Sequence, residues 1–199
     1  MATTRRRKLH EQMMGEILAG IVGGEYPEGS RLPKETDLAE RHEVSRYVAR
    51  ECIQALRDRG VLAVKHGVGA TVQPRDDWNL FDAVLLDAML SGPESDEVAT
   101  EMAECRRIVW PEVAAAAARR RTAADLDALQ AAEADEDEFR EALMRASGNR
   151  FLRHVLTALD AAAPSARRAR AGALGPLVTA IAERDEATSR DLMRRRLAP

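Results

Sequence analysis

The 199 residues are 45% hydrophobic and 32% charged, which is typical of a globular chain and excludes a disordered or low-complexity one. Only 4% are aromatic while Ala, Leu, Val and Arg dominate, so packed helices are favoured over a sheet sandwich. The formal net charge of −3 is unevenly spread: residues 1–75 carry 13 Lys/Arg against 10 Asp/Glu, and the remainder carries 17 against 23. A basic first part on an acidic second part indicates a polyanionic partner for the first part only.

Targeting and redox signals are absent from the sequence pattern. No apolar run approaches the roughly 20 residues that span a bilayer, and residues 1–8 are not followed by the apolar segment of a signal peptide. We therefore expect a cytoplasmic protein without a membrane contact. Cys52 and Cys105 are isolated and lack metal-ligand spacing, so the sequence predicts two reduced, mostly buried thiols.

The first part of the chain predicts three helices. Residues 1–7 are expected to form a basic, mobile arm, and the helix after it, 8–22, has an apolar residue at every fourth position. A short helix is predicted at 34–41, then a turn, then a helix at 45–59 in which Ser45 is the N-cap. The apolar stripe of the first helix consists of Leu9, Met13, Ile17 and Ile21.

A change of period follows the third helix. Residues 61–65 and 70–73 are strand-like and flank a four-residue loop that contains glycine, which predicts a β-hairpin. The order helix, helix, turn, helix, hairpin is that of a winged helix-turn-helix, here assigned to residues 1–75.

The rest of the chain predicts helices only. Residues 76–95 form a linker region that contains an amphipathic stretch, and 96–199 form an all-helical domain, which makes the fold class mainly α. Pro111 is expected to kink or split the first helix of this domain, whose candidate core includes Ile108. The acidic run 133–138 interrupts the second. The predicted helices are 101–121, 123–146, 151–162, 174–184 and 186–197.

The third helix carries a pattern suited to reading DNA. Arg46 and Arg50 lie one turn apart on a face away from the apolar residues, and guanidinium groups bind the O6 and N7 acceptors of guanine in bidentate geometry. Ser45 and Tyr47 add hydroxyl groups that reach phosphates. The alternative is that this face is simply solvated.

Two further features bear on this interpretation. At the tip of the hairpin His66 and Gly67 are candidates for a groove contact, because a glycine lets the backbone approach closely. Against the DNA-reading role, Arg50 has Asp37 and Glu51 as candidate ion-pair partners. The joint order of these elements within a short segment favours the functional interpretation.

That joint order also supports a family resemblance. Over about residues 10–73 the sequence resembles the DNA-binding domain of GntR-family regulators, through Leu32-Pro33, Glu35, Val44-Ser45-Arg46, Arg50, Leu56, Gly60, Gly69 and Val72. The resemblance implies that Arg46 and Arg50 read guanines of a short palindrome, and that His66 and Gly67 reach the minor groove. The chain departs from the pattern at Thr36, where members often carry Arg. Lys34 replaces a capping Ser, and its charge offers a substitute contact.

The helical half resembles the effector domain, called FCD, of the FadR-like subfamily. This resemblance is thinner, and the domain is shorter here than is usual in the subfamily. It rests on WNLFDAVLL (78–86), Glu104-Cys105-Arg106, Phe139 with Ala146-Ser147-Gly148-Asn149, and Ala180-Ile181 with Arg184-Asp185. The resemblance implies an effector pocket in which Arg106 anchors a carboxylate.

A metal site of that subfamily does not carry over. Members commonly hold a divalent metal with one Asp and three His, and these positions fall on Glu136, Arg140, Leu174 and Arg196. A guanidinium stays protonated and cannot ligate a metal, so we predict no metal and no other cofactor. Arg140 and Arg196 pair with Glu136, bind the carboxylate of an acidic effector, or lie on solvated faces.

These patterns lead to one main functional hypothesis. The chain is expected to be a homodimeric regulator that binds a palindromic operator in double-stranded DNA, and a ligand-responsive repressor of a carbon-source or organic-acid operon. The alternative is a constitutive repressor whose helical half only dimerises. An enzyme is not expected, because the consecutive carboxylates 135–138 point around a helix and no phosphate loop or nucleophile motif is present.

Overall fold

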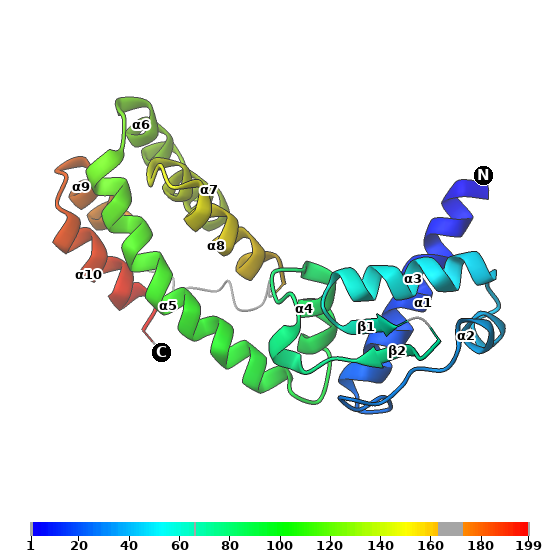
Figure 1. Ribbon diagram of the computed structural model, residues 1–199. Helices are drawn as coiled ribbons and strands as arrows, with labels where there is room; N and C mark the ends of the chain where they lie inside the picture. Colours follow the sequence, from blue (N-terminus) through cyan, green and yellow to red (C-terminus); the bar gives the residue numbers. More distant parts are fainter. Residues whose placement is uncertain (1, 66, 163–172, 199) are drawn as a thin grey trace. The chain divides into compact units, whose positions relative to one another are not determined.

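The computed structural model describes residues 2–65, 67–162 and 173–198. The chain forms two compact units, Met1–Asp96 and Glu97–Pro199. The first unit contains helices and one hairpin, and the second contains helices alone in its described part, which confirms the mainly α fold class (Figure 1). In the described ranges no helix is both long enough and apolar enough to cross a bilayer.

The first unit is a winged helix-turn-helix. Its first helix begins at Ala2, so the expected mobile arm is wrong for residues 2–7: Ala2 and the three arginines 5–7 favour helix, and no Gly or Pro interrupts them. The elements are α1 (Ala2–Val22), α2 (Glu35–Arg41), α3 (Arg46–Asp58), β1 (Leu62–Lys65), β2 (Gly69–Val72), a 3-10 turn (Arg75–Asp77) and α4 (Ala83–Leu90).

The three helices share one apolar core. The predicted stripe of α1 faces inward, since Met13, Ile17 and Ile21 are at most 3% exposed. α3 packs against both α1 and α2, and Leu38 of α2 and Leu56 of α3 are fully buried. Burying side chains of this size fixes α3 on its two neighbours.

The hairpin is the wing of this unit. β1 and β2 pair antiparallel from Leu62↔Val72 to Lys65↔Gly69, and an isolated bridge between Arg31 and Thr71 adds the segment before α2 to its edge. Gly60 joins α3 to β1 with φ of 77°, and a Cβ there would overlap the Asp77 carbonyl oxygen. Only glycine fits this junction.

The linker helix α4 packs on α1, within the first unit. Asp82 is its N-cap, accepting hydrogen bonds from the N–H groups of Val84 and Leu85 at 3.1 Å each. The Asp82 carboxylate also forms an ion pair with Arg59 at 3.0 Å, and this contact holds the start of α4 near the end of α3.

The second unit is built around a long central helix. α5 continues through Pro111 without a break, so the predicted split does not occur. The predicted helix over 123–146 is instead two helices, because the Asp135 carboxylate caps a new one by accepting from the N–H groups of Asp137 and Glu138. The helices are α5 (Ser95–Arg120), α6 (Ala123–Ala131), α7 (Glu136–Ala146), α8 (Arg150–Ala162), α9 (Gly175–Ala182) and α10 (Glu186–Arg196).

Two predictions about burial in α5 are wrong. Ile108 is 71% exposed rather than part of the core, and Cys105 is exposed rather than buried. Both lie in one stripe with Glu101 and Glu112, while the opposite stripe with Trp110 and Val113 is buried in the unit's core.

We expect Glu43→Gly to stabilise the protein. Glu43 lies in the turn between α2 and α3 with φ of 52°, is exposed, and makes no side-chain hydrogen bond or ion pair within the described ranges. The left-handed conformation is costly for a residue with a Cβ, so the gain in free energy of unfolding is about 0.5–1 kcal/mol after the entropy lost by glycine. Urea unfolding measures it.

The matched control is Gly60→Ala, which places a Cβ at a positive φ where no space exists. It should lower the free energy of unfolding by more than about 1 kcal/mol. A glycine at position 43 that destabilises the protein would contradict the proposed strain.

The two thiols should differ sharply in reactivity. Burial raises the pKa of the Cys52 thiol to about 11, so at pH 8 only about one molecule in a thousand carries this thiolate. Ellman's reagent should therefore titrate Cys105 quickly in the native protein and Cys52 only after unfolding. Cys105→Ser should abolish the fast phase, and a fast phase that persists in this variant would contradict the assignment.

Candidate nucleic-acid interface

The turn between α2 and α3 sets the direction of α3. The N–H of Val44 donates to the Ala39 carbonyl at 2.9 Å, which closes the turn on α2. Ser45 is the predicted N-cap of α3, and its Oγ accepts from the Val48 N–H at 3.3 Å. The hydroxyl hydrogen of Ser45 remains available to a phosphate, because the cap uses only the oxygen as acceptor.

The exposed face of α3 presents the predicted DNA-reading side chains. Arg46 and Arg50 are both exposed, and Tyr47 beside them is 57% exposed. Neither guanidinium has an ion-pair partner among the described residues, so the alternative pairing of Arg50 with a nearby carboxylate is not observed. The opposite face packs on the core through Val48, Ala49, Cys52, Ile53 and Leu56.

Gln54 lies at the edge of this exposed face and was not among the residues that the sequence predicted to contact DNA. It follows Arg50 by one helical turn and is half-buried, so it lies next along the same surface. A glutamine side chain binds the N6 and N7 groups of adenine in bidentate geometry. The helical period of α3 was the signal that would have identified it.

The other predicted contacts surround this face. Lys34 and Thr36 are exposed at the start of α2, where Lys34 occupies the N-cap position without a side-chain cap. The Thr36 hydroxyl donates to the Asp37 carboxylate at 2.9 Å. At the wing tip Gly67 is exposed with φ of 75°, and His66 lies outside the described residues.

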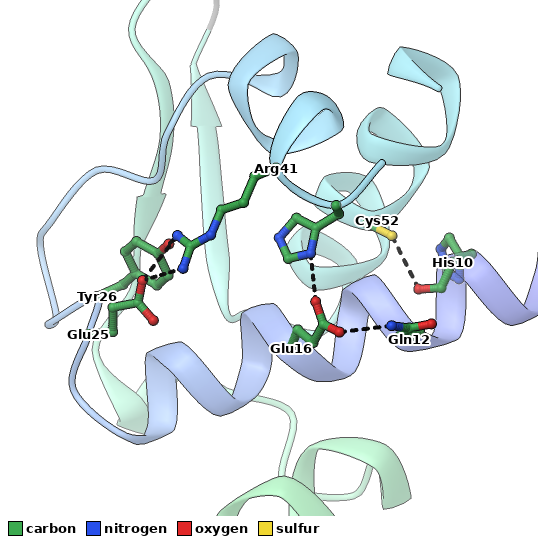
Figure 2. Close-up of polar contacts among 8 residues, drawn as sticks. His10, Gln12, Glu16, Glu25, Tyr26, Arg41 and Cys52 are labelled. Carbon is green, nitrogen blue, oxygen red and sulfur yellow. Dashed lines mark hydrogen bonds and ion pairs between the residues drawn. The ribbon is translucent and has the colours of Figure 1, made fainter. Parts of the chain in front are cut away.

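A set of polar contacts holds α2 and the turn against α1 and the segment that follows α1. Figure 2 shows the Arg41 guanidinium directed at Glu25 and Tyr26, with distances of 3.1 Å to the carboxylate and 2.8 Å to the phenolic oxygen. The Nδ1 atom of His42 lies 2.7 Å from the Glu16 carboxylate on α1. These contacts position the turn that precedes α3. The sequence did not predict these contacts, because they join residues far apart in the chain.

The carboxylates of this set are stabilised in their charged form. Hydrogen bonds from Gln12 and then His42 lower the pKa of Glu16, and hydrogen bonds from Tyr26 and then Arg41 lower the pKa of Glu25. Both carboxylates therefore stay ionised at neutral pH and keep their contacts to α2.

The thiol of Cys52 adds a contact on the buried side of α3. Its sulfur donates to the His10 carbonyl of α1 at 3.4 Å (Figure 2). The contact joins the middle of α3 to the first half of α1, and Cys52 lies on the apolar face of α3 that packs on the core.

In the second unit the three predicted effector-binding arginines are bound to the chain's own carboxylates. Arg106 on α5 is 5% exposed and donates to Asp160 of α8 at 3.0 Å, and it also contacts the Leu159 carbonyl. Arg140 and Arg196 are brought together, because both form ion pairs with Glu136. The alternative in which Arg140 and Arg196 lie on solvated faces is therefore wrong.

No group of three or more His, Cys, Asp or Glu side chains that suits a metal ion occurs in the described part of the chain. Three of the four positions at which the subfamily holds its metal carry Glu136, Arg140 and Arg196, and they form an ion-pair cluster instead. The fourth, Leu174, is buried in the core. The absence of a metal stays a prediction.

Comparison with known proteins supports the family assignment. Residues 9–72 match the family described as bacterial regulatory proteins, gntR family. The galactonate operon transcriptional repressor of Escherichia coli K12 is 34% identical over 132 residues, covering 63% of this chain and 58% of that protein. An uncharacterised HTH-type regulator of Mycobacterium tuberculosis, Rv0494, is 35% identical over 129 residues, covering 64% and 51%.

The aligned part thus spans little more than half the length of these two relatives. The transcriptional regulator LutR of Bacillus subtilis is 33% identical over 150 residues, which cover 68% of this chain and 67% of that protein. Among solved structures, Streptococcus agalactiae GntR has 23% identity and a TM-score of 0.48, covering 94% of this chain and 96% of that chain. The family match and the LutR alignment show that the chain belongs to the GntR family of bacterial regulatory proteins.

Proposed function

We propose that the chain is a DNA-binding transcription regulator that reads its operator with α3. The observation that carries this proposal is the pair Arg46 and Arg50, exposed together on α3 without a partner in the described residues. Since the opposite face of α3 is anchored in the core, the two guanidinium groups project together from the unit. This arrangement suits two neighbouring guanines in a major groove.

The surrounding residues supply positioning contacts. Lys34, Thr36, Ser45 and Tyr47 bind phosphates on either side of the groove, which sets the register of α3 without reading bases. At the wing tip Gly67 and its neighbour His66 enter the adjacent minor groove. A single unit of this kind offers too few base contacts for a specific affinity, so we propose a homodimer on a palindromic operator.

Two candidate functions remain, and they differ in the role of the helical half. The galactonate repressor among the relatives supports a ligand-responsive repressor of a carbon-source or organic-acid operon, in which Arg106, Arg140 and Arg196 bind the acid. A constitutive repressor with a helical half that only dimerises is favoured by another observation: all three arginines are engaged by Asp160 or Glu136.

Thermal unfolding and operator binding in the presence of a panel of sugar acids separate these candidates. An effector raises the melting temperature by mass action and changes operator affinity in the same concentration range. A panel that changes neither quantity argues for the constitutive regulator.

Arg46→Ala and Arg50→Ala should each lose base discrimination. Using an operator selected by the wild-type protein from random DNA, we expect a loss of about 1–3 kcal/mol at one base pair of each half-site, roughly ten- to a hundredfold in affinity. Binding to operators with single base changes, at fixed salt, measures the effect. Affinity for random DNA should change much less.

The matched control is Arg190→Ala, which removes one exposed guanidinium from the second unit and should leave operator binding nearly unchanged. If Arg46→Ala weakens binding to operator and random DNA equally, the side chain binds phosphate and the base-reading role is wrong. Wild-type protein without any affinity for DNA would overturn the proposed function as a whole.

A further inference from the structure

One carboxylate in the second unit receives two guanidinium groups. Arg140 Nε lies 3.3 Å from Glu136 Oε1, and Arg196 Nη2 contacts Glu136 Oε2, so each oxygen has its own cation. Arg140 comes from the same helix as Glu136, one turn later, while Arg196 comes from the end of α10. Two guanidinium groups that converge on the two oxygens of one carboxylate form a typical carboxylate-binding arrangement.

Trp110, Phe139 and Met193 surround the two arginines, while the Glu136 side chain between them is 33% exposed. Arg140 is 9% exposed and the Arg196 side chain 10%, and the Arg140 guanidinium lies 6.0 Å from the ring centroid of Trp110. The space left between Trp110, Phe139, Met193 and the three charged residues is about 10 Å³. This volume admits at most about one water molecule, so no organic acid fits beside Glu136.

The position of Glu136 fixes its carboxylate in this space. It is the first residue of α7, directly after the N-cap Asp135, where a helix favours negative charge. The helix start and the two cations therefore hold the side chain together. Removing it would leave two nearly buried guanidinium groups without this carboxylate, which is costly in a low-dielectric environment.

We propose that Arg140 and Arg196 form a carboxylate-binding site that the chain fills with its own Glu136. The side chain of Glu136 acts as a tethered ligand and joins α7 to α10. Consequently small organic acids do not enter this site in the wild-type protein, and the site accepts one only when the Glu136 side chain is removed. The inference concerns the second unit alone and does not depend on DNA binding. It argues against Arg140 and Arg196 as effector anchors in the ligand-responsive candidate and leaves Arg106 untouched.

Acetate rescue of Glu136→Ala tests this proposal. The substitution deletes a CH₂–COO⁻ fragment that acetate replaces almost atom for atom. In the full-length chain we expect the melting temperature to fall by about 5 °C, because the deleted carboxylate is one-third exposed while its two arginines are nearly buried. Sodium acetate at about tenfold above its Kd should restore roughly 3 °C relative to sodium chloride at equal ionic strength.

Three controls define the result. The wild-type protein should show no difference between acetate and chloride. Glu136→Gln should be destabilised yet insensitive to acetate, since the amide fills the space of the carboxylate. Glu112→Ala removes the partner of Arg190 in an exposed ion pair with a separation of 2.7 Å, and it should show no rescue because that site is open to water.

Equal responses of Glu136→Ala to acetate and chloride, or equal rescue of Glu112→Ala, would overturn the proposal. If Glu136→Ala does not fold in plain buffer, it is refolded with acetate and with chloride. If the helical circular dichroism signal returns only with acetate, the proposed carboxylate site is supported. If the variant refolds in neither salt, the proposal is overturned. Operator binding by these variants tests the proposed function only. The comparison of melting temperatures in acetate and chloride does not depend on it.

Discussion

The burial of one face of α3 is the constraint on which the DNA-facing surface depends. Its apolar residues are nearly inaccessible, with Ala49, Cys52 and Leu56 at 0% exposure, so α3 has a single rotational setting in the first unit. Because the helical period is fixed, that setting leaves Arg46 and Arg50 on the outside. The packing of the core thus fixes the direction of two side chains that are not part of the core. The packing of the other face therefore sets the direction of the two side chains to which the proposed function assigns base reading.

The contacts around the turn between α2 and α3 further restrict the orientation of α3. α2 is short, and a helix of seven residues is not stable without tertiary contacts. The Arg41–Glu25 ion pair and the His42–Glu16 contact attach its end to α1 and the segment after it. Exposed ion pairs contribute little stability individually, so their effect lies in limiting the directions in which the turn can lead into α3.

Local patterns in the sequence predicted most of the first unit, while contacts between distant residues could not be predicted. The Ser45 cap and the exposed side of α3 follow from short-range chemistry and the helical period. In contrast, the Arg106–Asp160 pair joins residues 54 positions apart, and no local pattern selects that partner. Ile108 was misplaced for a related reason, since apolar residues such as Val109 and Trp110 adjoin it in sequence and only the neighbouring helices decide which stripe of α5 is buried. The turn at Glu43 was predicted, but its positive φ was not.

The arginines of the two units show what separates a binding residue from a structural one. Arg46 and Arg140 are chemically identical, and each lies on a helix with a buried apolar face, but Arg46 is exposed whereas Arg140 is itself buried. They differ in whether the fold brings a carboxylate within reach: Glu136 meets Arg140, whereas the described residues bring none to Arg46. A guanidinium is always charged, so it requires an anion when it is buried and otherwise remains hydrated and available to one. Under the proposed function, DNA supplies what the first unit lacks: a phosphate as the anion, or the O6 and N7 acceptors of a guanine. In the second unit the chain supplies the anion itself, and a response to organic acids at that site would require moving Glu136.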